Sequence, residues 1–479
     1  MSVSTPAPLS HDELRVYNTR TRREELFTTI EPGKVGMYVC GATVYDSAHI
    51  GHGMSSIVFD MIRRYLMRIG YEVRYAQNFT DIDDKIINRA NDEGIDPGAL
   101  AECLIQEWDE QVAALNVLTP TVSPRATGEM PEIIRMIEGL IERSHAYESD
   151  GNVYFRVRSF TDYGKLSGRD IDELLVGARI EINESKADPL DFSLWKASKP
   201  GEPSWPSPWG EGRPGWHIEC SAMCTRHLNG VVDVHGGGRD LIFPHHENEI
   251  AQSEAFSGAT PFANFWLHNG MLQLNGEKMS KSLGNVVSLR SLIERGQQRA
   301  FRLQVLQTHY RSPLNYTDAG LEAASAGLDR LIAAAKAEST STLENQMVIG
   351  ESLVVLADAT SQRFHTAMND DFDTPSAIAS LFELARSINR LRTQSGGTSQ
   401  FRAAQRTLID LASVLGLELE EAPSRSVGDA SSFIDLLIEV RSQLRKSRQW
   451  DAADRIRIGL HERGIALEDN PTGTNWKKI

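Results

Sequence analysis

The sequence is poor in cysteine and in long apolar stretches, and both shortages exclude whole classes of protein. Four cysteines among 479 residues are too few for the disulfide framework of a small secreted protein. No apolar run approaches the ~20 residues that a membrane-spanning helix needs. The first ten residues are polar and lack the charged-then-apolar order of a signal peptide. We therefore expect a cytoplasmic protein that makes no membrane contact.

Positive charge is also in short supply. There are 50 Lys and Arg against 65 Asp and Glu, a net charge of −15, which argues against a protein that binds polyanions over its whole surface. In residues 425–479, however, ten basic residues outnumber eight acidic ones. A nucleic-acid contact needs only a local basic face, so the C-terminal region is where we expect one.

The order of secondary-structure signals predicts an α/β protein. A β-rich run at 34–40, helical spacing of apolar residues over 51–68 and a second β-rich run at 73–78 predict a parallel β–α–β unit of a nucleotide-binding sheet. Strand-like alternation at 151–157 indicates an inserted module, and helical periodicity dominates after residue 291. The length suggests roughly three or four domains. We predict the segments 1–120 (first half of the nucleotide-binding domain), 121–212 (insertion), 213–290 (second half), 291–422 (helical bundle) and 423–479 (small C-terminal module).

Two short motifs have the composition of phosphate-binding sites, although no P-loop is present. His49 and His52 flank Gly51 at the predicted start of the helix. Two ring donors would there add to free backbone N–H groups and the positive end of the helix dipole, and Gly51 would let a nucleotide approach closely. Taken alone, the pair is more often two surface histidines near a turn.

The second motif is the run GEKMSKSLGN at 276–285, a small hydroxyl-rich loop that carries Lys278 and Lys281. A mobile lysine between serines suits the neutralisation of a leaving pyrophosphate. Taken alone, it is equally a solvated basic loop.

Together, HIGH at 49–52 and KMSKS at 278–282 resemble the two signatures of class I aminoacyl-tRNA synthetases. The resemblance implies activation of an amino acid by ATP and Mg²⁺ as its adenylate, followed by transfer to the 3′ end of a tRNA. It makes His49, His52, Lys278 and Lys281 the catalytic residues, with Gly51 also at the ATP.

Four residues form a chemically sensible zinc set. Cys40 ends the first predicted strand, Cys220 lies in a later helix, and His245 and Glu249 are spaced i, i+4 on one helical face. The spacing alone is weak evidence, since either cysteine taken singly is better explained by core packing. Competing registers would bring in His246 or Glu247. Zinc binds a thiolate far better than a neutral hydroxyl, so such a site would separate cysteine from serine.

Four further runs resemble one family within this class, the cysteinyl-tRNA synthetases: residues 38–45 (YVCGATVY), 78–86 (NFTDIDDKI), 215–220 (GWHIEC) and 235–249 (HGGGRDLIFPHHENE). The resemblance implies one zinc ion per chain, held by Cys40, Cys220, His245 and Glu249, which selects the thiolate of L-cysteine. It leaves Cys103 and Cys224 as structural residues.

The same resemblance assigns residues around the substrates. It puts Gly41, Thr43, Thr80 and Trp216 around the cysteine, and Gly237 and Asp240 at the adenosine. The acidic residues Asp81, Asp83 and Asp84 could bind Mg²⁺, but we prefer a solvated or helix-capping role, because nucleotide-bound Mg²⁺ is held largely by phosphates.

The C-terminal region resembles the anticodon-binding end of these synthetases. Arg445, Arg448 and Arg455 would contact phosphates of tRNA(Cys), and Trp476 would stack on a base; an exposed amphipathic helix is the plainer explanation. This region disfavours a cysteine:glucosaminyl-inositol ligase, which shares the motifs but lacks a tRNA-reading domain. A zinc-dependent RNA-binding regulator and a small nucleotidylyltransferase are further alternatives. We expect a monomer.

Overall fold

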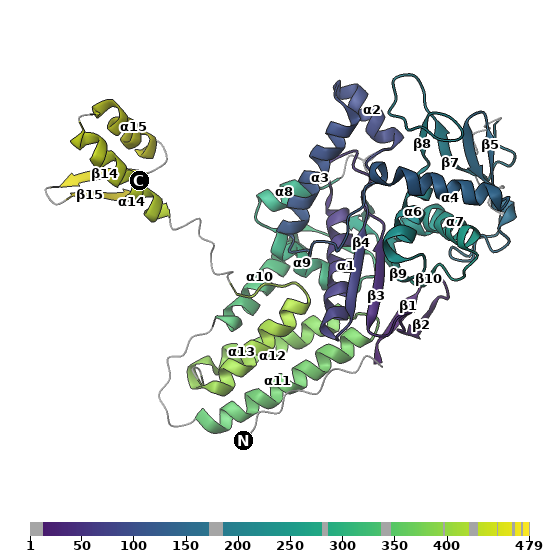
Figure 1. Ribbon diagram of the computed structural model, residues 1–479. Helices are drawn as coiled ribbons and strands as arrows, with labels where there is room; N and C mark the ends of the chain where they lie inside the picture. Colours follow the sequence, from purple (N-terminus) through teal and green to yellow (C-terminus); the bar gives the residue numbers. More distant parts are fainter. Residues whose placement is uncertain are drawn as a thin grey trace. The chain divides into compact units, whose positions relative to one another are not determined.

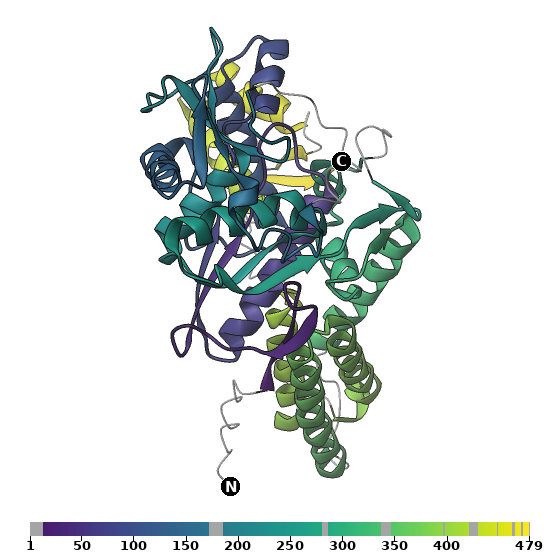
Figure 2. The same cartoon turned by 90° about the vertical axis from the view of Figure 1, so that its right-hand side faces the viewer.

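The computed structural model describes residues 13–171, 185–279, 286–336, 346–395, 398–420, 430–447, 449–461, 465–470 and 473–478 (Figures 1 and 2). Its contacts divide the chain into two units, Met1–Leu419 and Glu420–Ile479, which are described separately. None of the helices in these residue ranges is both long and apolar enough to cross a membrane.

The centre of the first unit is a four-stranded parallel sheet in the order β10-β9-β3-β4. Its strands are β3 (Lys34–Val39), β4 (Glu72–Gln77), β9 (Val232–Gly238) and β10 (Ala263–Asn269). Helix α1 (Ile50–Arg68) joins β3 to β4, so the predicted β–α–β unit is confirmed. Because β4 and β9 flank β3 on opposite sides, the winding of the sheet reverses between β3 and β9. In open α/β sheets, ligands bind at the carboxyl ends of the strands at this reversal.

Both faces of the sheet are covered by helices (Figure 1). Met37 and Val39 of β3 belong to the apolar cluster that contains the buried face of α1. Tyr38, which points the other way, belongs to a second cluster. That cluster is built with α4 (Met130–Glu142), α6 (Trp216–Leu228) and α7 (Glu247–Ser257). The central strands are therefore buried on both sides, as parallel strands usually are.

Two smaller sheets and a hairpin complete the β structure of the first unit. The antiparallel sheet, in the order β5-β6-β7-β8, lies between β4 and β9 in the chain. Its strands are β5 (Ala146–Ser149), β6 (Asn152–Phe155), β7 (Phe192–Ala197) and β8 (Gly212–Pro214). The hairpin consists of β1 (Arg15–Asn18) and β2 (Arg23–Leu26). The other sheet consists of β11 (Leu272–Leu274), β12 (Glu277–Lys278) and β13 (Leu314–Tyr316).

The remaining elements are mostly helical, and the predicted fold class is confirmed. The first unit adds α2 (Asp84–Glu93), α3 (Pro97–Ala114), α8 (Leu289–Glu294), α9 (Gln298–Leu306), α10 (Asp318–Ala335), α11 (Gln346–Asn369), α12 (Thr374–Ser395) and α13 (Ser399–Val414). Helices α10 to α13 pack together as a bundle. The second unit contains α14 (Ala430–Lys446), α15 (Trp450–His461) and the antiparallel pair β14 (Ile465–Asn470) and β15 (Gly473–Lys478).

A buried arginine ties the sheet domain to the bundle. Arg302 on α9 is 2% exposed and donates to the carbonyl oxygens of Leu115 (2.9 Å), Asn116 (3.0 Å) and Leu415 (2.8 Å). It also pairs with Asp60 of α1, which is itself fully buried. One guanidinium thus serves the ends of α3 and α13 and the middle of α1.

We expect Arg302→Met to lower the free energy of unfolding by about 3–5 kcal/mol, because it leaves the buried Asp60 without this partner and removes the guanidinium donor from the carbonyl groups of Leu115 and Leu415. Arg299→Met on the same helix is the control, since Arg299 is exposed and bonds to the Glu418 carbonyl. Thermal unfolding midpoints compare the two. Equal midpoints would contradict the role given to Arg302.

Candidate active site

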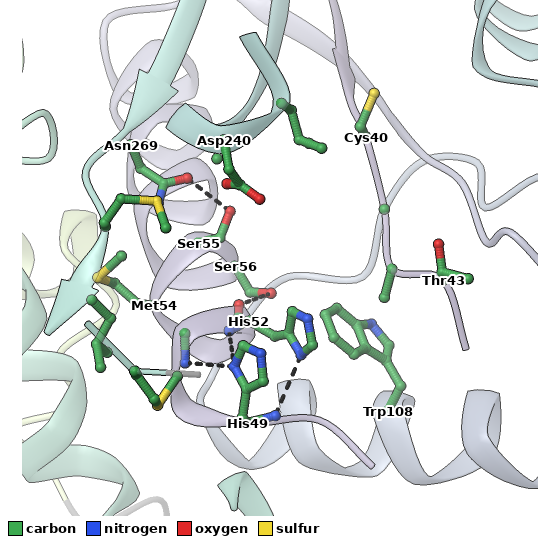
Figure 3. Close-up of a pocket in the computed structure, with 18 of the residues that line it drawn as sticks. Cys40, Thr43, His49, His52, Met54, Ser55, Ser56, Trp108, Asp240 and Asn269 are labelled. Atoms are coloured by element: carbon green, nitrogen blue, oxygen red, sulfur yellow. Dashed lines mark hydrogen bonds between the residues drawn. The ribbon is translucent and has the colours of Figure 1, made fainter. Parts of the chain in front are cut away.

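A cavity of about 430 Å³ opens at the carboxyl ends of β3 and β9, where the sheet reverses (Figure 3). Eight of the residues singled out in the sequence line it. They are Cys40, Gly41, Thr43, His49, Gly51, His52, Trp216 and Asp240. The fold therefore brings the histidine motif and the start of the metal cluster to one pocket.

The two histidines cap α1 with their own rings. His49 is the N-cap residue, and its Nδ1 accepts the backbone N–H groups of Gly51 (3.1 Å) and His52 (3.4 Å). His52 Nδ1 accepts the backbone N–H of His49 (3.3 Å), and the rings stack 3.8 Å apart. The expectation that these backbone N–H groups are free for an anion is thus wrong. Because both Nδ1 atoms accept, each neutral ring carries its proton on Nε2, which makes Nε2–H the ring donor.

The four predicted zinc ligands come together beside the pocket. One donor atom each from Cys40, Cys220, His245 and Glu249 lies within 4.8 Å of the others. The Cys40 thiol donates to Glu249 Oε1 (3.1 Å) and lies 3.5 Å from His245 Nε2. His245 Nε2 is 3.1 Å from the same carboxylate oxygen. Cys40 directly follows β3, Cys220 lies on α6, His245 lies in the turn before α7, and Glu249 lies on α7.

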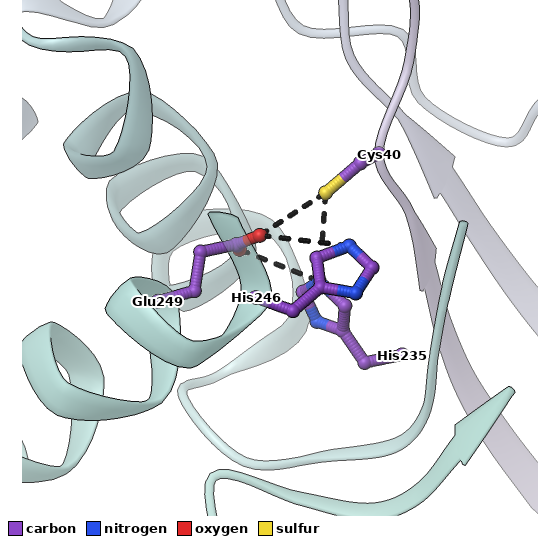
Figure 4. A group of neighbouring side chains, drawn as sticks. All are labelled: Cys40, His235, His246 and Glu249. Atoms are coloured by element: carbon purple, nitrogen blue, oxygen red, sulfur yellow. Dashed lines mark hydrogen bonds and ion pairs between the residues drawn. The ribbon is translucent and has the colours of Figure 1, made fainter. Parts of the chain in front are cut away.

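A second set shares two of these residues. One donor atom each from Cys40, Glu249, His235 and His246 also lies within 4.8 Å of the others (Figure 4). Of the two alternative ligands that the sequence left open, His246 therefore belongs to this second set. Glu247 is turned elsewhere, because its carboxylate accepts backbone N–H groups of the loop at 164–167 (2.8–3.4 Å).

The charges of Cys220, His245 and Glu249 shift one another's pKa values in directions that favour binding of a cation. Burial raises the pKa of the Cys40 thiol, and the hydrogen bond from Cys40 lowers the pKa of Cys220 to about 6. Burial alone would lower the pKa of His245, but Glu249 and Cys220 raise it to about 10. Burial acts to raise the pKa of Glu249, yet His235 and His245 hold it well below its usual value. A proton on His245 thus balances anionic sulfur and oxygen donors, and a divalent ion with Cys, His and Glu ligands would replace that proton.

In the second set, His246 is neutral and lies against another neutral histidine, His268. His246 Nδ1 lies 2.8 Å from His268 Nε2, and His268 Nδ1 lies 2.8 Å from Thr19 Oγ1. Burial lowers the pKa of His268 to about 3 and the pKa of His246 well below its usual value. His235 Nε2 lies 3.3 Å from Glu249 Oε2 and so holds the second carboxylate oxygen.

The residues predicted around the substrates do not all line the pocket. Trp216 is 38% exposed, lines the pocket and packs its ring 4.4 Å from the ring of His245. Thr80 is buried and donates its hydroxyl to Glu219 (2.8 Å). Gly238 lines the pocket beside Asp240, whereas a Cβ at Gly237 would meet Leu241 and His246.

The carboxylates of Asp81, Asp83 and Asp84 all bind other groups of the protein. Asp83 caps α2, and Asp81 accepts the backbone N–H of Thr127 (3.0 Å). Asp84 pairs with Lys196 (2.6 Å) and with Arg213, both in the antiparallel sheet. The predicted capping role is confirmed for Asp83, whereas Asp81 binds Thr127 and Asp84 binds two strands of the antiparallel sheet.

Several predicted residues lie outside the described residues or in the second unit. Lys281 and Arg448 fall outside the described residues, as does the side chain of Lys278, whose backbone ends β12. In the second unit, Arg445 lies on α14 and Arg455 on α15. Trp476 on β15 packs partly against the small core of that unit.

Sequence reasoning missed Trp108 and Asn269, which also line the pocket (Figure 3). Trp108 on α3 meets the ring of His52 edge-on at 5.9 Å. Helical periodicity gives it no functional signal, since it reads as a core residue. Asn269 accepts the hydroxyl of Ser55 (2.9 Å). Its place at the carboxyl end of a parallel strand was a usable signal.

We expect Gly41→Ala to disrupt the pocket wall. A Cβ at Gly41 would lie 1.7 Å from the backbone oxygen of Asn78, which cannot move aside as a side chain could. A cost near the upper end of the ~1–3 kcal/mol for overpacking follows, seen as a lower thermal unfolding midpoint. Gly128→Ala is the matched control, since a Cβ there meets nothing within 4 Å. A Gly41→Ala midpoint no lower than that of the control would refute the argument.

Family comparisons cover most of the chain. A model described as tRNA synthetases class I (C) catalytic domain matches residues 26–326, and a DALR domain model matches residues 363–420. Solved structures share the fold at low identity. The methionyl-tRNA synthetase of Mycobacterium tuberculosis with methionyl-adenylate has a TM-score of 0.55 at 16% identity, over 80% of this chain and 90% of its own. The LeuRS of Agrobacterium radiobacter K84, in a ternary complex with tRNA and LeuAMS, reaches 0.59 at 12% identity, over 82% and 85%.

Curated relatives are similar over nearly their whole length. A cysteine–tRNA ligase of Dehalococcoides mccartyi is 50% identical over 464 residues, 97% of this chain and 99% of its own. The cysteine–tRNA ligase of Alkalilimnicola ehrlichii is 51% identical over 475 residues, 97% of this chain and all of its own. Since identity at this level extends through both the catalytic and the C-terminal regions, the chain belongs to the cysteine–tRNA ligase family of class I aminoacyl-tRNA synthetases.

Proposed function

We propose that this chain activates L-cysteine with ATP and Mg²⁺ as cysteinyl adenylate and then transfers it to tRNA(Cys), with release of diphosphate and AMP. One observation carries the proposal. A cluster of sulfur, nitrogen and oxygen donors reaches, through Cys40, the same pocket as two histidines with Nε2–H donors. A thiol-recognising centre therefore lies beside a phosphate-recognising one.

Cys40, Cys220, His245 and Glu249 would hold one zinc ion, and the bound ion would favour a thiolate over the hydroxyl of serine. This set is supported over the one with His235 and His246, because Trp216, a residue that lines the pocket, packs on His245. His235 and His246 would instead orient Glu249 from behind, as partners of metal ligands commonly do.

The protein side chains orient and stabilise without forming a covalent bond. The carboxylate of cysteine attacks the α-phosphorus of ATP, and diphosphate leaves with its electron pair. His49 and His52 donate Nε2–H to phosphate oxygens as negative charge builds up there. Trp216 covers the substrate side chain and Asp240 faces the ribose. Lys278 and Lys281 neutralise the diphosphate, while Arg445, Arg448, Arg455 and Trp476 contact the tRNA.

The proposal is tested by incubating the purified full chain with ATP, Mg²⁺, radiolabelled cysteine and bulk bacterial tRNA. We expect acid-precipitable label that ribonuclease removes and that excess unlabelled serine does not compete away. Discrimination against serine should exceed the ~10–200-fold that an apolar pocket gives for one group. Pyrophosphate exchange with cysteine but no labelled RNA would instead favour a small-molecule ligase.

Removal of one cluster residue should release the metal. We expect Cys220→Ala to weaken zinc binding by more than the ~10–100-fold that loss of an outer-shell partner costs, measured as zinc content after dialysis. Cys224→Ala is the control, because Cys224 lies one turn along the same helix, is buried, and belongs to neither donor set. Equal zinc content in the two variants would refute the assignment of Cys220.

A further inference from the structure

Glu107 on α3 lies between the segment before the histidine motif and the first turn of α8, which follows the lysine motif in the chain. Its side chain is 11% exposed. It accepts the hydroxyl of Ser47 (3.3 Å), two residues before His49, and the amide of Gln111 (2.6 Å) on its own helix. It also accepts from Arg290, with Nη2 at 2.8 Å and Nε at 3.3 Å. One carboxylate therefore binds the segment before the histidines and the first turn of α8.

The same two segments are joined through their backbones. The N–H of Ile50 donates to the Val287 carbonyl (3.1 Å), and the N–H of Leu289 donates to the Ala48 carbonyl (3.0 Å). Residues 286–290 follow the lysine motif directly in the chain. These backbone bonds fix the distance between the segments, and the Glu107 contacts fix both against α3.

Helix α3 also contacts the catalytic ring directly. Trp108, the residue after Glu107, lies edge-on to the ring of His52. A shift of α3 relative to residues 47–52 would move the Nε2 donors, and a displacement near 1 Å at a reacting centre can cost on the order of 100-fold in rate.

We propose that Glu107 is a positioning residue for adenylate formation. It aligns the histidine motif with the segment that follows the lysine motif. This rests on the proposed function, because it concerns the step in which both motifs handle the triphosphate. Glu107 touches no reacting atom. Its effect reaches the substrate through Ser47, Arg290 and the backbone bonds between them.

The variants are Glu107→Gln, which keeps the shape and removes the charge, and Arg290→Ala, which removes the partner. The Arg290 side chain is 58% exposed, so its loss does not threaten folding. Glu102→Gln is the matched control, since Glu102 lies on α3 and pairs with an arginine, Arg125, but is bonded to neither Ser47 nor Arg290.

We expect each variant to lower kcat of cysteine-dependent ATP–pyrophosphate exchange about tenfold, with KM for cysteine unchanged, since transition-state alignment and not cysteine binding is lost. The double variant should be no slower than the slower single one, because both changes break the same pair. Transfer of cysteine from preformed enzyme-bound adenylate to tRNA, measured in a single turnover, should keep its wild-type rate. Glu102→Gln should leave exchange unchanged.

A merely structural role would give a different result. Exchange and transfer falling together, with a lower thermal unfolding midpoint, would overturn the inference, as would exchange unchanged in Glu107→Gln and Arg290→Ala. If Glu107→Gln does not fold, the Arg290→Ala split between exchange and transfer decides. Absence of exchange in the unsubstituted chain would overturn the proposed function itself, which distinguishes that failure from one confined to Glu107.

Discussion

The buried carboxylate of Glu249 is the constraint on which the site depends. It is fully buried between Cys40, His235 and His245. An isolated carboxylate in such a place would be neutral, because burial penalises its charge. The surrounding imidazoles keep it ionised. The fold therefore maintains negative charge inside the protein, and a cation must accompany it, whether as a proton on His245 or as a metal ion.

The helix that carries Glu249 shows how the fold accommodates this charge. Helix α7 is buried along most of its length although its sequence, ENEIAQSEAFS, is largely polar. Several of its buried polar groups have hydrogen-bond partners from other segments. The loop at 164–167 donates to Glu247, and Tyr163 donates to Asn248 (2.5 Å). Gln252 donates to the hydroxyl of Ser221 (2.8 Å) on α6. The loops around α7 thus compensate for its polarity and, in doing so, fix the direction of Glu249.

This arrangement explains which features could be predicted from sequence. Helix α1 was predictable, because its apolar residues recur at helical spacing and one face is buried. The clustering of Cys40, Cys220, His245 and Glu249 came from resemblance and not from spacing. The burial of α7 was not predictable, since periodicity classes a polar helix as exposed and cannot reveal partners far away in sequence. For the same reason the ring cap by His49 was missed: an N-cap is ordinarily expected from Ser, Thr, Asp or Asn.

The distribution of the donors along the chain links metal binding to closure of the sheet. Cys40 follows β3, and its N–H donates to the Gly236 carbonyl on β9 (3.0 Å), about two hundred residues later in sequence. Cys220 and Glu249 lie on the two helices that flank β9 in the chain. The four donors can therefore meet only after β9 has paired with β3 in the native register. In the unfolded chain they are far apart, so the free energy of binding an ion at this site adds to the stability of the closed sheet. Binding of an ion by these four residues and completion of the nucleotide-binding domain would therefore depend on the same strand pairing.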